Sequence, residues 1–160
     1  MIKKINRTDI DECVEVIRGS FRTVADEFGF TAENAPRFTA FATTRERLEY
    51  QLEIEHRPMY AYTENDRIVG YYSLAKRENN EFELNNLCVL PGYRHKNIGT
   101  SLLEDSYAKA AALGCNKMTI GIVEENTVLK KWYERNGFVH TGTQKFDFFP
   151  FTCGYMERIL

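Results

Sequence analysis

The sequence has no long hydrophobic run and no excess of charge of either sign. No uninterrupted apolar stretch approaches the roughly 20 residues that cross a bilayer, and the start, Met1-Ile2-Lys3-Lys4-Ile5, leads into no signal-peptide core. The 160 residues include 21 lysines and arginines against 23 aspartates and glutamates, a net charge of -2. The chain therefore lacks the overall basic charge of a nucleic-acid-binding domain. We expect a cytoplasmic protein with neither a membrane nor a nucleic acid as its partner.

Cysteine and histidine are sparse and scattered. The four cysteines are Cys13, Cys88, Cys115 and Cys153, and the three histidines are equally isolated. No pair has the short spacing of a zinc knuckle or a redox dithiol, so we expect no metal site and no disulfide framework. Cys88 and Cys153 fall in strand-like stretches, where a free thiol packs as a small hydrophobic group.

What the sequence does contain is the composition of one globular domain, residues 1–160. Hydrophobic residues make up 43% and aromatic residues 13%, enough to fill a core and still line a pocket. The hydrophobic pattern predicts strands at 2–5, 59–63, 68–74, 82–90, 117–123, 138–146 and 152–159, and helices at about 98–113 and 127–136. We therefore expect one α/β domain with a mixed sheet.

The residues before the second predicted strand are less regular. Thr8 is placed to cap a helix in which apolar residues recur at helical spacing up to Phe21. Thr43 with Glu46 forms a capping-box pattern for a second helix that ends near residue 54. Residues 23–42 show no clean period, and long connections of this kind are often functional.

The most informative segment runs from Asn86 to Leu103. A buried type of strand ends at Pro91 and a helix begins near Ile98, with a basic loop between them. Free N–H groups at a helix start, together with the helix dipole, favour a phosphate, and Gly99 lets a ligand approach the backbone closely. Taken alone, the same residues also describe an ordinary strand–loop–helix connection with a solvated loop.

A second segment, from Asn126 to Phe138, follows a strand and precedes another. Together the two segments resemble the GCN5-related N-acetyltransferase (GNAT) superfamily. That family holds acetyl-CoA with a Val-x-Pro turn and an Arg/Gln-x-x-Gly-x-Gly/Ala loop, followed downstream by Asn, Tyr and Gly-Phe. The matching residues here are Val89, Pro91, Arg94 to Gly99, Asn126, Tyr133 and Gly137-Phe138.

The match has one departure in the loop. Asn97 stands where the family has its first loop glycine, and Thr100 follows Gly99. Asparagine visits left-handed backbone conformations more readily than other non-glycine residues, so the loop can still turn.

The resemblance implies the GNAT (acyl-CoA N-acyltransferase) fold, with a mixed, mostly antiparallel sheet flanked by about four helices. It also implies acetyl-CoA as co-substrate and no metal. The pyrophosphate would contact the amides from Arg94 to Thr100, and the pantetheine arm would run beside Leu87 to Val89. The cofactor-binding residues are then Leu87, Cys88, Val89, Arg94, His95, Lys96, Asn97, Ile98, Gly99, Thr100 and Asn126.

The same resemblance implies an N-acetyltransferase in which an amine attacks the thioester directly. Tyr133 matches the family's general acid for the leaving thiolate, although it could instead simply fill a buried helix face. Glu83 stands in register for a general base, with Glu81, Glu124 and Glu125 as competitors and a solvated strand-end residue as the alternative.

We expect the acceptor to be a small-molecule amine or a peptide N-terminus, with an amino acid also open. Its pocket should be built from residues 23–42 and the aromatic stretch 146–151, which suits an acceptor with apolar bulk or one whose cation Asp147 holds. Two other functions stay open: a non-catalytic acyl-CoA-binding or sensing module, and transfer of a different acyl group. A homodimer also stays open.

Overall fold

The computed structural model describes residues 1–160, and its centre is one seven-stranded sheet in the order β1-β2-β3-β4-β5-β7-β6. The strands are β1 (Ile2–Lys4), β2 (Met59–Glu64), β3 (Arg67–Lys76), β4 (Glu81–Val89), β5 (Lys117–Val123), β6 (Val139–Lys145) and β7 (Thr152–Ile159). Every neighbouring pair is antiparallel except β4 and β5. The predicted mixed, mostly antiparallel sheet is confirmed.

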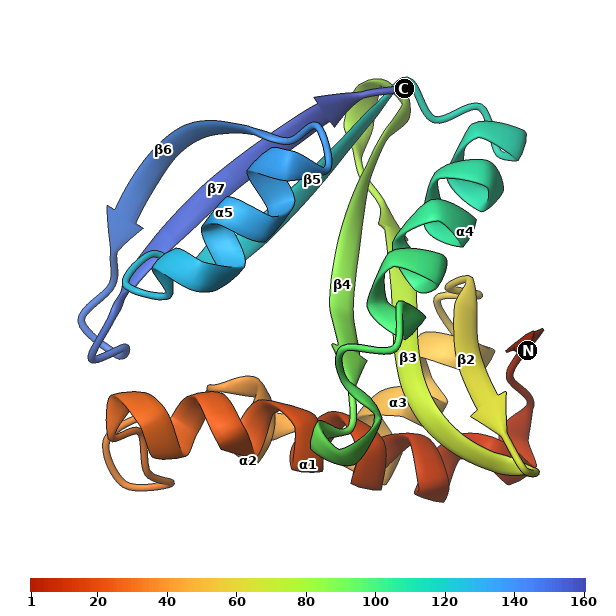
Figure 1. Ribbon diagram of the computed structural model, residues 1–160, viewed down its shortest axis with the longest axis horizontal. Coiled ribbons are helices and arrows are strands. Elements are labelled where there is room, and N and C mark those ends of the chain that lie inside the picture. The colour runs from red at the N-terminus through yellow and green to blue at the C-terminus, as the bar shows by residue number, and fades with distance from the viewer.

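Five α-helices accompany the sheet: α1 (Ile10–Phe28), α2 (Thr39–Ala42), α3 (Arg45–Glu53), α4 (Ile98–Ala112) and α5 (Thr127–Arg135). About four were predicted, and the additional one is α2, a single turn. In Figure 1, α1 crosses below the sheet, while α4 lies beside β3 and β4 and α5 lies beside β5 and β7. No helix combines the length and the apolar composition that a membrane span requires.

Three predictions for the N-terminal third are wrong in detail. Thr8 does not cap α1: a 3-10 turn at Arg7–Asp9 precedes the helix, and Asn6 caps that turn by accepting the N–H of Thr8. Thr44, rather than Thr43, caps α3. The helix α1 also runs on to Phe28, through the segment in which no period was visible, because its last turns pack against other aromatic residues instead of the sheet.

The strands β4 and β5 pair for three residues and then diverge. Residues 81–83 of β4 face residues 117–119 of β5, and no pairing follows beyond Glu83. Further along, β4 carries one extra residue against β3, at Asn86, whose φ is 55°. A bulge of this kind bends a strand and increases its twist. The two halves of the sheet therefore open away from each other, with α1 lying across the open end (Figure 1).

Aromatic side chains join the two halves of the sheet across this open end. Phe30 and Phe38, from the chain around α2, pack with Phe151, which precedes β7, at ring-centroid distances of 4.9 to 5.8 Å. Phe21 of α1 and Phe149 contact the same group. We call these five phenylalanines the aromatic floor, because they close the gap between β4 and β5 on the side of α1.

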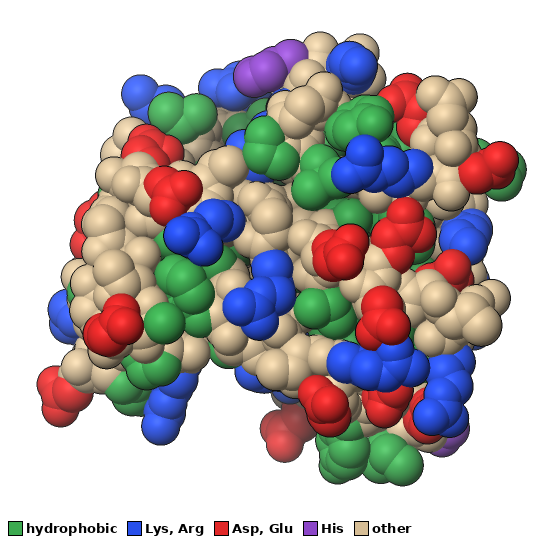
Figure 2. Space-filling model, turned by 90° about the horizontal axis from the view of Figure 1, so that it is seen from below, with side chains coloured by type: hydrophobic (Ala, Val, Ile, Leu, Met, Phe, Trp, Pro, Cys, Tyr) green, Lys and Arg blue, Asp and Glu red, His purple; other side chains and the backbone are tan.

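The face that α1 covers carries charges of both signs. Figure 2 views the molecule from this side and shows basic and acidic side chains interspersed with hydrophobic ones. No field of one sign extends over this face, which therefore offers no surface suited to a polyanion.

Candidate functional site

A cavity of about 250 Å³ lies in the gap between β4 and β5. It is lined by 21 residues, of which 14 are hydrophobic, from both strands, from α1, α2 and α5, and from the chain around β7. Both predicted acceptor segments contribute to it, although Phe146, Asp147 and Phe148 do not line it and only Phe149 and Phe151 do so from the aromatic stretch. A mostly apolar cavity with a few polar groups is typical of a small-molecule site.

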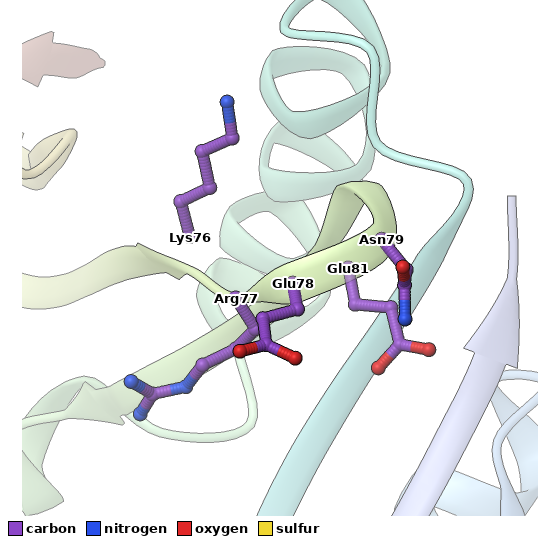
Figure 3. Close-up of a pocket in the computed structure, with 5 residues that line it drawn as sticks. All are labelled: Lys76, Arg77, Glu78, Asn79 and Glu81. Carbon is purple, nitrogen blue, oxygen red and sulfur yellow. The ribbon is translucent and has the colours of Figure 1, made fainter.

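A second, open hollow lies at the turn between β3 and β4. Its five lining residues are all polar: Lys76, Arg77, Glu78, Asn79 and Glu81. Figure 3 shows that Lys76 and Arg77 point away from each other. The hollow has no apolar wall, and its side chains do not converge on one point. We therefore interpret it as the exposed surface of a turn and not as a binding site.

Six consecutive main-chain amides lie together where α4 begins. The first hydrogen bond of the helix runs from the N–H of Ser101 to the carbonyl of Asn97, at 3.0 Å. The N–H groups of residues 95–100 donate to no group in the protein. We call residues 95–100 the amide cradle: His95, Lys96, Asn97, Ile98, Gly99 and Thr100. Unpartnered amides at the positive end of a helix dipole form a site for an anion.

Two residues give the cradle its shape. Asn97 has a φ of 63°, the left-handed conformation that its side chain was expected to tolerate. Gly99 needs no such freedom, since a Cβ there would lie 3.8 Å from Trp132 and 3.9 Å from Val89, both ordinary contacts. The fold therefore does not require glycine at position 99. The lack of a side chain there leaves space beside the main-chain amides of the cradle.

Arg94 does not belong to the cradle, contrary to the expectation that its charge contacts the ligand. Its Nε donates to the carbonyl of Val89 at 2.9 Å, its Nη1 to Oγ1 of Thr23 at 3.1 Å, and its Nη2 to the carbonyl of Ser20 at 3.0 Å. All three nitrogens are thus engaged with β4 and α1. Burial lowers the pKa of Arg94 from its ordinary value. Its role in the structure is to tie the loop to both elements.

The other basic residues near the loop differ in their freedom. Lys96 is exposed, and its Nζ lies 5.4 Å from the ring centroid of Tyr93. Lys130 of α5 is paired with Glu124 at 2.8 Å, so it adds no unpaired charge. Of these lysines, Lys96 is the one able to meet an anion at the cradle.

The edge of β4 that faces the gap offers further main-chain groups. The N–H of Leu90 donates to the carbonyl of Val69 in β3, and successive residues of a strand point their main-chain groups to opposite edges. Leu87 and Val89 therefore face the gap, whereas Cys88 faces β3, where it pairs with Tyr71. Of the three residues predicted to contact the pantetheine arm, Cys88 is thus the one whose main-chain groups face β3 and not the gap. Burial raises the pKa of its thiol to about 12.

Asn126 begins α5, where its side-chain oxygen accepts the N–H of Leu129 at 3.2 Å. This confirms the predicted cap. The residue also lines the cavity.

Tyr133 lines the cavity from α5 and is 6% exposed. Its ring packs edge-on against Trp132 and Phe138, and its hydroxyl forms no hydrogen bond within the protein. Burial raises the pKa of this hydroxyl above its ordinary value. Tyr133 thus presents a protonated donor that has no partner among the protein's own groups.

Glu83 is the one carboxylate that lines the cavity. Its Oε2 accepts from Nε and Nη2 of Arg77 at 3.1 and 2.8 Å. Side chains alternate between the faces of a strand, and Leu84 shares the core cluster of Tyr133. Glu83 therefore lies on the opposite face of β4 from Tyr133, so the two residues approach the cavity from different sides.

The three competing carboxylates are held elsewhere. Glu81 pairs with Lys117 at 2.9 Å, and Glu125 accepts the N–H of Thr152 at 3.0 Å. Glu124 accepts from Lys130 and His140; although burial opposes them, these bonds hold the pKa of Glu124 below its ordinary value. None of the three lines the cavity.

Three residues of the site escaped the sequence reasoning. Trp132 lies against Gly99, and its place between two signature residues was a signal that could have shown this. Asn86 makes the bulge, which an asparagine inside a strand pattern could have suggested. Arg37 lines the cavity from a segment without periodicity, where no signal was available.

Known proteins resemble this chain over most of its length. A model of the acetyltransferase (GNAT) family matches residues 25–138. An uncharacterized N-acetyltransferase of Mycobacterium tuberculosis strain H37Rv is 27% identical over 139 residues, which are 87% of this chain and 88% of the relative.

Two solved structures share the fold. The PaiA N-acetyltransferase of Thermoplasma acidophilum, in complex with coenzyme A, superposes with a TM-score of 0.84 at 22% identity and covers 100% of this chain and 98% of its own. A ribosomal-protein-alanine N-acetyltransferase of Brucella melitensis superposes with a TM-score of 0.77 at 19% identity, covering 100% and 99%.

We predict that Arg94→Ala lowers the free energy of unfolding by about 1–2 kcal/mol, because three charge-assisted hydrogen bonds are lost from a half-buried site. Arg94→Lys should recover little, since one ammonium cannot reach all three acceptors. Urea denaturation followed by circular dichroism measures the change. The control is Lys96→Ala, in the same loop but exposed, which should not alter stability. Equal stability of Arg94→Ala and the parent would show that the three hydrogen bonds of Arg94 do not stabilise the loop.

Proposed function

The chain belongs to the acetyltransferase (GNAT) family, and from this premise we propose that it moves the acetyl group of acetyl-CoA to a primary amine by direct attack. One observation carries the proposal: the amide cradle, the open edge of β4 and the cavity with Tyr133 lie next to one another. Gly99 of the cradle lies beside Val89, and Leu87 of the same edge lines the cavity. The anion site and the cavity are therefore joined by one stretch of β4.

The residues present fit acetyl-CoA. The six amides of the cradle suit a pyrophosphate, with Lys96 as the nearby cation. The N–H groups of Leu87 and Val89 and the carbonyl of Leu87 suit the amides of a pantetheine arm, which would add to β4 as a strand does. The carbonyl of Val89 is already taken by Arg94. The relative from Thermoplasma acidophilum was solved with coenzyme A, which supports this assignment.

The chemistry requires three contributions from the chain. The amine nitrogen bonds to the thioester carbon and the C–S bond breaks, while a main-chain amide at the open edge of β4 stabilises the negative charge that develops on oxygen. Tyr133 gives its proton to the departing sulfur, and the proton that the nitrogen loses as the amide forms restores the tyrosine through solvent. With an ordinary tyrosine pKa of about 10 the hydroxyl is already protonated at neutral pH, and burial raises this pKa further, so the proton is present for donation.

Glu83 provides the negative charge on the other side of the cavity. An alkyl amine has a reference pKa near 10.4 and arrives mostly protonated at pH 7, in an unreactive form. Glu83 takes this proton, directly or through a water molecule. Its bond to Arg77 keeps the carboxylate in place at the cavity wall.

The acceptor class is an amine, either of a small molecule or of a peptide N-terminus. The fold relative from Brucella melitensis acts on a ribosomal-protein alanine by its name, so a peptide acceptor is among the candidates. A sensing module that binds acyl-CoA without turnover would need no free acid, and the unpartnered hydroxyl of Tyr133 favours the enzyme.

Gly99→Ala should weaken acetyl-CoA binding about tenfold or more, because the methyl group occupies the space beside the cradle amides. Its effect on the melting temperature should be small, since the Cβ meets only ordinary contacts. Calorimetry with acetyl-CoA gives the affinity. Gly92→Ala is the matched control, because a Cβ there has nothing within 4 Å and its amide lies outside the cradle. Unchanged affinity in a folded Gly99→Ala protein would contradict the cradle assignment.

The proposed activity and the acid are tested together. With acetyl-CoA and a panel of amines, the parent should release CoA thiol only when an amine is present, and a thiol reagent reads this out. Tyr133→Phe should lower kcat by about 10- to 100-fold, towards the low end of general-acid effects, because a thiolate is already a fair leaving group.

Two results would count against this account. Tight acetyl-CoA binding without amine-dependent thiol release for any acceptor would favour the sensing module. An unchanged kcat in Tyr133→Phe, with chemistry rate-limiting, would reduce the tyrosine to a packing residue. The phenylalanine variant should keep the parent's stability, because the hydroxyl has no partner in the protein to lose.

Glu83→Gln should lower kcat/KM strongly near neutral pH and less at high pH, where more of the amine is already deprotonated. The loss of kcat/KM is smaller at high pH because the amine is already deprotonated there. It then no longer needs the proton acceptor that the variant lacks. A pH profile with one defined amine measures it, with Glu81→Gln as the control outside the cavity. A parent-to-variant ratio that stays constant with pH would show that Glu83 only positions the ammonium or has no role.

A further inference from the structure

The rim of the cavity carries one exposed cation, Arg37, that no carboxylate of the protein neutralises. Arg37 lines the cavity next to the aromatic floor, and it takes part in none of the ion pairs of the structure. Its Cζ lies 4.1 Å from the ring centroid of Phe148. An aromatic ring attracts a guanidinium but leaves its N–H groups unpaired in the plane. Arg37 can therefore donate to an anion that enters the cavity.

The position of Arg37 is set by its neighbours in the chain. Ala35, two residues before it, and Phe38, directly after it, are 0% and 6% exposed, and the N–H of Phe38 donates to the carbonyl of Ala35 at 3.0 Å. The backbone of this short segment is thus anchored in the aromatic floor, while Phe148 holds the end of the side chain. Arg37 itself is exposed and Phe148 does not line the cavity, so the guanidinium lies at the rim of the cavity, within reach of an anion that enters it.

The remaining charge in the cavity is that of Glu83, which Arg77 already pairs. All other lining residues are uncharged, and most are hydrophobic. An amine acceptor with a second positive charge would find no free carboxylate there and would face Arg37. An acceptor with its own anionic group would find a guanidinium able to hold a carboxylate with two parallel hydrogen bonds.

We propose that the acceptor is a free α-amino acid with an apolar or aromatic side chain, and that Arg37 selects it by binding its carboxylate. The inference rests on the proposed acetyl transfer and names the substrate class of the same site. The amine is then directed to the gap beside Glu83, and the side chain lies on the aromatic floor. Polyamines lack the anion, and a peptide N-terminus has an amide in place of the α-carboxylate, so both are poorer acceptors.

The test uses three amines that differ only at the carboxylate: L-phenylalanine, L-phenylalaninamide and phenethylamine. Arg37→Gln should raise KM for phenylalanine about tenfold, as expected for the loss of a charge-assisted pair, and leave kcat nearly unchanged. For the amide and for phenethylamine, the kinetic constants should stay within about twofold. Because the amines differ in basicity, the parent-to-variant ratio for each amine is the informative quantity.

The control is Arg47→Gln, an exposed arginine on α3 outside the cavity, which should change none of these values. Equal effects of Arg37→Gln on all three amines, or no effect on any, would overturn the proposal. Faster turnover of a peptide amide or a polyamine than of every amino acid would overturn it as well.

A binding measurement separates this inference from the proposed activity. Calorimetry on the protein saturated with CoA compares N-acetyl-L-phenylalanine with N-acetylphenethylamine. The parent should bind the acid about tenfold more tightly, and Arg37→Gln should abolish the difference. This result would support carboxylate selection even if none of the amines were acetylated, in which case the proposed function fails instead. Equal affinity of the parent for both compounds would overturn the inference.

Discussion

The divergence of β4 from β5 is the constraint on which the rest of the site depends. Strand pairing ends at Glu83, and the bulge at Asn86 turns β4 away. A continuous sheet would use the main-chain groups of Leu87 and Val89 in a further ladder. Because the strands separate, these groups stay available, the cavity forms between the two halves, and α5 can bring Tyr133 to it. Arg94 then fixes the loop to β4 and α1, so that the cradle lies at the end of the same groove.

Most of the fold could be predicted because local rules agree with the tertiary structure. The strands β5 and β7 have the predicted bounds, and Asn126 caps α5 as expected. The hairpin between β2 and β3 turns through Asn65 and Asp66, both at positive φ, as polar turn residues suggest. The errors fall between residues 6 and 44, where α1 leaves the sheet and packs on phenylalanines that come from distant parts of the chain. The spacing of hydrophobic residues within one segment does not reveal such contacts.

The parts of the site that are formed by main-chain groups could be predicted from the sequence. The position of the amide cradle follows from a strand that ends, a loop and a helix that starts, and the pattern contains all three. The role of Arg94 did not follow, because two of its three partners lie more than 70 residues away in α1. Likewise, the position of Arg37 at the cavity depends on how the halves of the sheet meet, which spacing does not reveal. The pair of Glu83 with Arg77, in contrast, spans only six residues of the β3–β4 hairpin.

The central claim is that the unpartnered amides of the cradle and of the β4 edge hold acetyl-CoA. Residue-resolved amide hydrogen exchange tests it most directly, because it reads each N–H separately. On saturation with acetyl-CoA, the amides of residues 95–100 and of Leu87 should exchange at least about tenfold more slowly. The amides of Asn65 and Asp66, in a distant turn, should not change. Unaltered exchange at the cradle and at Leu87 in a protein saturated with acetyl-CoA would contradict the account.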